Sequence, residues 1–225
     1  AAALGGVGTN DSGLETTVAQ AIEWCWKQQN ADVISLSLGG EQDQNTTRMS
    51  DTESAVQLAL ANGAYVVAAA GNNGGTEDDN LVSSPSNVPL VIAVGAIDED
   101  RFLWKHSTSG SAIDLSLYDH PNLKPEIVAP GTGIISTVPN GPYYMSSGTS
   151  GATVFVTGAL TLILEKYPEL KSADSACMPL VKQSLMESAK SNPNYIEVDG
   201  HNFSYGYGSL DALEWSKAIA ANLPC

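Results

Sequence analysis

A serine in a Gly-Thr-Ser-Gly segment is the first feature of this 225-residue chain that could perform covalent chemistry. Ser150 lies in the segment Ser147–Ala152, directly before an apolar stretch that we predict to be a helix. The free N–H groups and the dipole at a helix N-terminus favour developing negative charge. A serine at such a position is more often only a helix cap. Ser150 is therefore a candidate nucleophile, and taken alone the segment leaves the capping role open.

Two further segments follow predicted buried strands. Asn72 comes directly after Ala68–Gly71, and an asparagine on such a tight turn can aim its amide into a cleft as an oxyanion donor. The alternative is a turn residue selected for its backbone freedom. The segment Ser35–Gly40 ends in two glycines, which allow another backbone to approach closely.

The elements that must position these residues alternate along the chain. Strands are predicted over 33–38, 65–70 and 90–96, with shorter extended pieces at 127–128 and 134–135. Helices are predicted over 14–29, 52–61, 151–167, 178–190 and 210–222. This alternation indicates a parallel sheet with right-handed crossovers, and ligands of such sheets bind at the carboxyl ends of the strands. The helix over 151–167 is apolar nearly all round, which predicts burial on every side. No linker divides the chain, so we expect a single domain over 1–225.

Charge and cysteine content limit the partners. The chain carries 25 Asp and Glu against 10 Lys and Arg, a formal net charge of -15. Nucleic acid and anionic membrane surfaces both need a basic footprint, so we expect neither as a partner. No run reaches the roughly 20 apolar residues of a membrane-spanning helix. Cys25, Cys177 and Cys225 lack metal-type spacing, and either a Cys177–Cys225 disulfide or free thiols fit the sequence.

Taken together, the three segments resemble the subtilisin-like serine peptidases, the subtilases. Five short motifs occur here in the family's order: Ser-Leu-Gly-Gly at 37–40, Ala-Ala-Gly-Asn at 69–72, Val-Ile-Ala-Val-Gly-Ala at 91–96, Ala-Pro-Gly at 129–131 and Gly-Thr-Ser at 148–150. The resemblance extends from about Gly6 to a closing motif at Tyr205–Ala212. It implies a three-layer α/β fold with a mostly parallel central sheet flanked by helices. The match covers the C-terminal, serine-containing two-thirds of that fold, without its N-terminal strands.

The resemblance assigns roles to individual residues. Ser150 is implied as the nucleophile and Asn72 as the donor to the oxyanion. A peptide substrate would pair with Ser37, Leu38 and Gly39, which with Ala69, Ala70 and Gly71 would wall the pocket for the P1 side chain, the residue before the cleaved bond. Thr149 is also placed among the substrate-binding residues. Ser83 would form part of the pocket floor, beside a cis proline at Pro85, and indicates a neutral P1 side chain.

The catalytic mechanism also needs a histidine and an aspartate, because a serine hydroxyl is a poor nucleophile until an oriented imidazole removes its proton. In subtilases both residues precede the Ser-Leu-Gly-Gly strand, whereas the 36 residues before Ser37 contain no histidine. We expect His106, His120 and His201 to be structural or solvent-facing. We further expect a second polypeptide fragment, produced by nicking upstream of Ala1, to supply the aspartate and histidine and to fill a gap in the sheet between strands at 1–7 and 33–38.

The predicted function is that of a serine endopeptidase acting on extended peptides or proteins, with no cofactor for the chemistry. The alternative is an inactive pseudoprotease or peptide-binding module that retains the groove, and the presence of both Ser150 and Asn72 favours the enzyme. A nucleotide-binding enzyme is disfavoured, because no Gly-x-Gly-x-x-Gly turn follows the first strand. The family implies stabilising Ca²⁺, for which the acidic segment 77–80 is a candidate besides being a solvated loop, together with a propeptide and an extracellular location.

Overall fold

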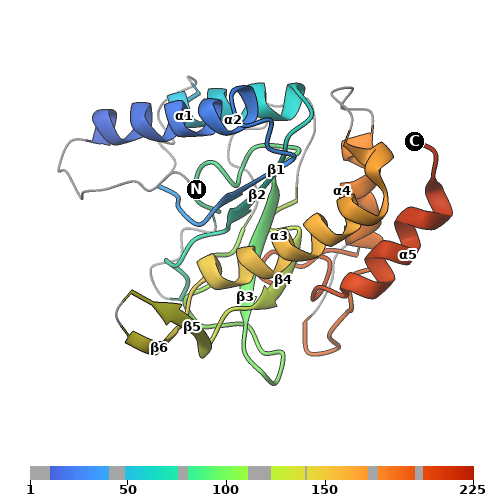
Figure 1. The fold of residues 1–225 in the computed structure, drawn as a ribbon. Coiled ribbons are helices and arrows are strands. Elements are labelled where there is room, and N and C mark those ends of the chain that lie inside the picture. Colours follow the sequence, from blue (N-terminus) through green and yellow to red (C-terminus); the bar gives the residue numbers. More distant parts are fainter. Residues whose placement is uncertain are drawn as a thin grey trace.

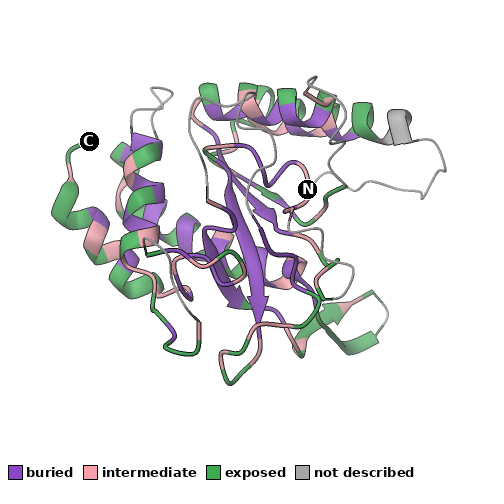
Figure 2. Ribbon diagram, turned by 180° about the vertical axis from the view of Figure 1, so that it is seen from behind, coloured by how far each residue is buried: buried purple, intermediate pink, exposed green. Residues whose placement is uncertain are grey.

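Four short apolar segments form one parallel sheet in the computed structural model, which describes residues 11–40, 49–75, 81–110, 123–139, 141–171, 177–195 and 200–225. The strands are β1 (Val33–Leu36), β2 (Tyr65–Ala69), β3 (Ile92–Ile97) and β4 (Ile127–Pro130), in that order across the sheet. Every residue of β2 and β3 is buried (Figure 2). Strands covered on both faces read as continuous apolar runs, which is why they could be predicted from the sequence.

Helices pack around this sheet (Figure 1). The long helix α3 (Thr149–Lys166) crosses the sheet and contacts all four strands. Helix α1 (Asp11–Lys27) packs on α2 (Asp51–Ala61), next to β1 and β2, and α4 (Cys177–Glu187) packs on α5 (Ala212–Asn222). A short 3₁₀ turn, η1 (Pro168–Leu170), follows α3 at the proline that ends it. The predicted α/β fold is thus confirmed. Within the described part of the chain, no helix combines the length and apolar character needed to cross a membrane.

A separate hairpin precedes α3. Its strands β5 (Ile134–Val138) and β6 (Gly141–Ser146) are antiparallel, and every residue of β6 is exposed. The start of β5 was predicted as an extended piece. Strand β6 was not predicted, because without a buried face it has no alternation of apolar and polar residues.

One expectation about α3 is wrong. The helix is not buried on all sides: Val154, Phe155 and Leu162 are 59%, 46% and 67% exposed. Its opposite side, which includes Val156 and Leu160, packs into the core. An apolar composition indicates that a helix face prefers burial. It does not indicate which part of the polypeptide, or which other chain, would bury it.

A buried ion cluster connects the loop before β3 to α4. The Glu126 carboxylate lies 2.7 Å from Lys124 Nζ and 2.5 Å from Lys182 Nζ, and it accepts a hydrogen bond from the Ala93 N–H at 2.7 Å. Lys124 also donates to the carbonyls of Val88 and Val91. Burial lowers the pKa of Lys124 to about 7, against the opposing effect of the Glu126 charge. The cluster therefore ties the residues before β3 to the start of β4 and to α4.

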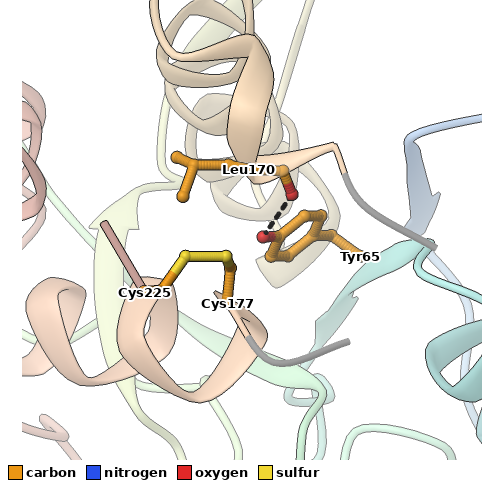
Figure 3. Close-up of a disulfide and its surroundings, with 4 residues drawn as sticks. All are labelled: Tyr65, Leu170, Cys177 and Cys225. Atoms are coloured by element: carbon orange, nitrogen blue, oxygen red, sulfur yellow. Dashed lines mark hydrogen bonds between the residues drawn. A yellow bond between two sulfur atoms is a disulfide. The ribbon is translucent and has the colours of Figure 1, made fainter. Parts of the chain in front are cut away.

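A disulfide links Cys177, at the start of α4, to Cys225, which follows α5 and lies 48 positions further along the chain (Figure 3). Sequence alone left this pairing open, and the structure decides it. Cys25 is a free thiol. Beside the disulfide, Tyr65 Oη donates to the Leu170 carbonyl at 3.0 Å, and burial raises the pKa of this tyrosine to about 12. The disulfide thus ties the segment after α5 to the start of α4, and the tyrosine contact ties η1 to β2.

We expect the double variant Cys177→Ser/Cys225→Ser to lose about 2–5 kcal/mol of unfolding free energy, because the cross-link restricts the unfolded chain. Urea denaturation of the oxidised wild type and the variant measures this difference. Cys25→Ser is the matched control, since it replaces a thiol without opening a cross-link. Equal stability of the double variant and this control would contradict the stabilising role of the disulfide.

Candidate active site

The three candidate segments come together at one edge of the sheet. The parallel register pairs Leu36 with Ala68, so the residues that follow β1 and β2 lie side by side beyond the strand ends. The N-terminus of α3 lies at the same place. Ser150 Oγ donates to the Ser37 carbonyl at 3.3 Å, and Ser37 Oγ donates to the Ser150 carbonyl at 3.1 Å. Residues more than a hundred positions apart in the chain are thus in direct contact.

The capping role that the sequence left open for Ser150 is not what the structure shows. The N-cap position of α3 is Gly148, and no side chain caps this helix. Ser150 is the second residue after this N-cap and is half-buried, with its hydroxyl directed at Ser37. Its own backbone N–H is one of the free donors at the start of a helix. The hydroxyl is therefore available for chemistry.

Asn72 is held by Thr149. Its Oδ1 accepts a hydrogen bond from the Thr149 N–H at 3.0 Å and another from Thr149 Oγ1 at 2.9 Å. Because a backbone N–H can only donate, the amide must present its oxygen to Thr149 and its Nδ2 elsewhere. Nδ2 has no hydrogen-bond acceptor among the described residues, and Asn72 is exposed. The Asn72 amide is thus fixed in orientation, and its Nδ2 is a candidate oxyanion donor.

Two donors flank one small space. A Cβ built on Gly148 would lie 3.7 Å from Asn72 Nδ2 and 3.8 Å from the Ser150 backbone nitrogen. Both nitrogens therefore border the volume next to Gly148, beside the Ser150 hydroxyl. Two N–H groups that border one space beside a serine hydroxyl are the donors that an oxyanion hole requires.

The residues predicted to wall a P1 pocket surround Ser83. The Ser83 N–H donates to the Ala70 carbonyl at 2.8 Å. A Cβ on Gly39 would lie 2.8 Å from Ser83 Cβ, and a Cβ on Gly71, where φ is +120°, would lie 2.4 Å from Ser83 Oγ. Only glycine fits at these two positions while Ser83 stays between them. The Ser84–Pro85 bond is cis, as the resemblance implied.

No histidine reaches Ser150 within the described residues. His201 is buried with Nε2 2.9 Å from the Pro125 carbonyl, and its ring packs against Phe203 and Tyr207. His106 is exposed and packs edge-on against Trp104. His120 lies outside the described residues. The structure thus gives His106 and His201 surroundings of their own, away from any hydrogen bond to the nucleophile.

An apolar face of α3 that no described residue covers begins next to Ser150, the candidate nucleophile. It consists of Val154, Phe155, Gly158 and Leu162, and no atom lies within 4 Å of a Cβ built on Gly158. Exposed apolar side chains that gather on one helix face make this face a candidate interaction site. Strand β1 is the outer strand of the sheet as far as the structure describes it. The strand predicted within residues 1–7 lies outside the described residues, so the expected gap beside β1 stays a prediction.

Metal ligands are not assembled in the described part of the chain, which holds no group of three or more His, Cys, Asp or Glu residues suited to an ion. The calcium candidate at 77–80 lies outside the described residues. No step of the chemistry below depends on a metal.

Two features of the site could not be found from sequence. Thr149 was assigned to substrate binding only by resemblance, and its hydrogen bonds to Asn72 join residues 77 positions apart. The exposed face of α3 could not be predicted, because the apolar composition of the helix indicated burial on all sides. Neither has a local sequence signal, because each depends on what the fold brings alongside.

Comparison with known proteins agrees with this geometry. The model of the Subtilase family matches residues 1–208. Subtilisin DY of Bacillus licheniformis is 34% identical over 203 residues, which cover 90% of this chain and 63% of that protein. The major intracellular serine protease of Bacillus subtilis (strain 168) is 39% identical over 163 residues, 72% of this chain and 45% of the relative.

Among solved structures, the prenylagaramide maturation protease PagA superposes with a TM-score of 0.73 at 28% identity, covering 91% of this chain and 68% of that structure. The patellamide maturation protease PatA gives a TM-score of 0.72 at 28% identity, covering 92% and 70%. The chain spans less than two-thirds of the length of the curated relatives named here.

Proposed function

Since this chain belongs to the subtilase family, we propose that it carries the nucleophile and the oxyanion donors of a serine endopeptidase. The observation that supports this most directly is the pair of N–H donors, Asn72 Nδ2 and Ser150 N, that border one space beside the Ser150 hydroxyl. Backbone geometry and a threonine-held amide keep both donors in place before any substrate arrives. Preorganised donors of this kind are a large source of rate acceleration in acyl transfer.

The proposed chemistry is acyl transfer to water. Ser150 Oγ attacks the carbonyl carbon of the scissile peptide bond while a histidine takes the hydroxyl proton. The carbonyl oxygen becomes an oxyanion that accepts hydrogen bonds from Asn72 and the Ser150 N–H. The carbon–nitrogen bond then breaks, and the histidine returns the proton to the leaving amine. Water, deprotonated by the same histidine, hydrolyses the acyl-enzyme and restores Ser150.

The substrate is proposed to be an extended peptide or protein segment. Ser37, Leu38 and Gly39 follow β1 and belong to no strand pairing among the described residues, so we propose that they pair with a substrate backbone. The P1 side chain would enter between this segment and Ala69–Gly71, towards Ser83. Because Ser83 is small and uncharged, we propose a preference for a neutral P1 side chain.

The histidine and aspartate are proposed to come from polypeptide outside residues 1–225. Two observations support this: neither His106 nor His201 bonds to Ser150, and the apolar face of α3 stands uncovered beside the nucleophile. A segment packed on Val154, Phe155 and Leu162 would bury that face and lie within reach of Ser150. We propose that this segment is present as a second fragment.

The setting of the enzyme is proposed to be extracellular. The Cys177–Cys225 disulfide supports this, because such bonds persist in oxidising compartments, and the net charge of -15 fits a secreted protein. A propeptide and stabilising Ca²⁺ belong to the same proposal and rest on the family alone.

The competing function is a pseudoprotease that binds peptides without cleaving them. The absence of an imidazole at Ser150 in the described residues is the observation in its favour. It would keep the groove at Ser37–Gly39 but would have no use for a held oxyanion donor such as Asn72. For this reason we favour the peptidase.

Labelling with a fluorophosphonate separates the two functions. The reagent phosphonylates only an activated serine, so we expect the native protein to gain one label at Ser150, read out by intact mass. The same spectrum should show the polypeptide that carries the histidine and aspartate. A protein that takes no label, and has no such companion, would be a pseudoprotease or an inactive fragment instead.

A further inference from the structure

Glu53 is a buried carboxylate on α2 that reaches the loop beneath the proposed P1 pocket. It is 8% exposed. Its Oε1 accepts hydrogen bonds from Ser84 Oγ at 3.0 Å and from Asn87 Nδ2 at 2.7 Å. None of the ion pairs between described residues includes Glu53. Burying a carboxylate is costly unless its oxygens are hydrogen-bonded, so these contacts restrict where the loop can lie.

Only half of this side chain is explained by helix capping. Ser50 N donates to Glu53 Oε2 at 3.0 Å, and Glu53 N donates to Ser50 Oγ at 3.1 Å, which together form a capping box at the start of α2. This motif uses Oε2 alone. Oε1 is directed away from the helix, to residues 31 and 34 positions further along the chain. The second oxygen therefore serves the loop and not the cap.

The loop that Glu53 holds is bonded to both walls of the pocket. Ser84 and Gly40 exchange two backbone hydrogen bonds, each of 3.0 Å, and the preceding Ser83 N–H donates to the Ala70 carbonyl. The Ser83 side chain lies against Gly39 and Gly71. A shift of Ser84 must therefore move Ser83, and with it the depth to which a side chain can enter between the two walls.

We propose that Glu53 is a positioning residue that sets the depth of the P1 pocket by fixing Ser84 and Asn87. The inference rests on the proposed peptidase function. Glu53 acts through Ser83 and does not touch the substrate or Ser150. It therefore governs discrimination between long and short P1 side chains and leaves the acyl-transfer chemistry unchanged.

The test is Glu53→Gln in the complete, active protein, assayed with two peptides that differ only in having Phe or Ala at P1. A glutamine cannot accept at both oxygen positions, so the loop loses part of its support and must be ordered by the substrate instead. We expect KM for the Phe peptide to rise about fivefold or more, with kcat within about twofold. KM for the Ala peptide, whose side chain does not reach the floor, should stay within about twofold.

Two variants separate this role from a structural one. Ser50→Ala breaks the capping box but leaves the Oε1 contacts, so it should lower the melting temperature by about 2–4 °C and leave the ratio of the two KM values unchanged. Ser84→Ala removes only the hydroxyl that Oε1 holds and should reproduce the change in that ratio on a smaller scale. It also carries the test if Glu53→Gln does not fold. An unchanged ratio in Ser84→Ala and in any folded Glu53→Gln, or the same change in Ser50→Ala, would overturn the proposal.

The outcome also distinguishes this inference from the function on which it rests. A wild-type protein that takes no fluorophosphonate and cleaves neither peptide overturns the peptidase function and this inference with it. A wild type that cleaves both peptides, combined with variants of unaltered P1 selectivity, overturns the role of Glu53 alone.

Discussion

Replacing Ser150 with alanine is expected to lower kcat for peptide hydrolysis by about 10⁶-fold, the size of this effect in subtilisin, a member of the same family. The variant removes the nucleophilic oxygen, and without its attack the oxyanion that Asn72 Nδ2 and the Ser150 N–H are placed to stabilise does not form. Peptide binding should persist, because the groove at Ser37–Gly39 and the pocket at Ser83 are untouched. Stopped-assay kinetics with a fluorogenic peptide measure the rate, and fluorescence anisotropy of a labelled, uncleaved peptide measures binding.

Ser136→Ala is the matched control for this substitution. Ser136 is exposed on the β5–β6 hairpin, so its loss should leave the rate within about twofold of wild type. A Ser150→Ala variant that retained more than about one-hundredth of the wild-type rate would place the nucleophile elsewhere in the protein. Both variants also serve as references in the labelling experiment, where only Ser150→Ala should lose the mass of the label.

The sheet could be predicted from the sequence because its strands are buried on both faces. Val66, Val67 and Ala68 in β2, and Ala93 and Val94 in β3, have almost no exposed surface, and such segments must be apolar along their whole length. The hairpin strand β6 carries no comparable constraint. Its residues Tyr143, Tyr144 and Met145 are more than 60% exposed, so neither a period of two nor an apolar run announces a strand.

The site was predictable in its parts and ambiguous in their roles. A serine before a helix can be a cap, and an asparagine after a strand can be a turn residue; each local pattern fits both interpretations. The structure adds contacts that no local pattern contains. Gly148 occupies the capping position, and Thr149 turns the Asn72 amide so that its oxygen faces the protein. The family resemblance had indicated the same roles without these physical reasons.

The uncovered face of α3 illustrates a different limit. Sequence tells which side chains prefer burial, and Val154, Phe155 and Leu162 do. It does not tell which polypeptide would bury them, since burial depends on the tertiary contacts and not on the helix sequence alone. The same physical fact underlies both the wrong expectation of a fully buried helix and the proposal that a histidine-bearing segment lies against it.

Asn72→Ala is expected to lower kcat by about 10²–10³-fold, the loss measured for an oxyanion-hole asparagine in subtilisin, with KM within a few-fold of wild type. The amide contacts the substrate oxygen strongly only once it carries negative charge, so its removal destabilises the transition state more than the bound substrate. Steady-state kinetics on one P1 peptide separate the two parameters.

The neighbouring asparagine provides the matched control. Asn73 is exposed, and its backbone N–H bonds Thr108 Oγ1 at 2.9 Å whatever its side chain. Asn73→Ala should therefore retain kcat within about twofold. Thr149→Val is the complementary test. It keeps the Thr149 N–H bond to Asn72 Oδ1 and removes the hydroxyl, which contacts Asn72 Oδ1 at 2.9 Å and also the N–H and carbonyl of Gly71 at 3.3 and 3.2 Å. If Thr149 acts by orienting the Asn72 amide, Thr149→Val should not lower kcat further in the Asn72→Ala background. Additive effects of the two substitutions would mean that Asn72 is not the group that Thr149 positions.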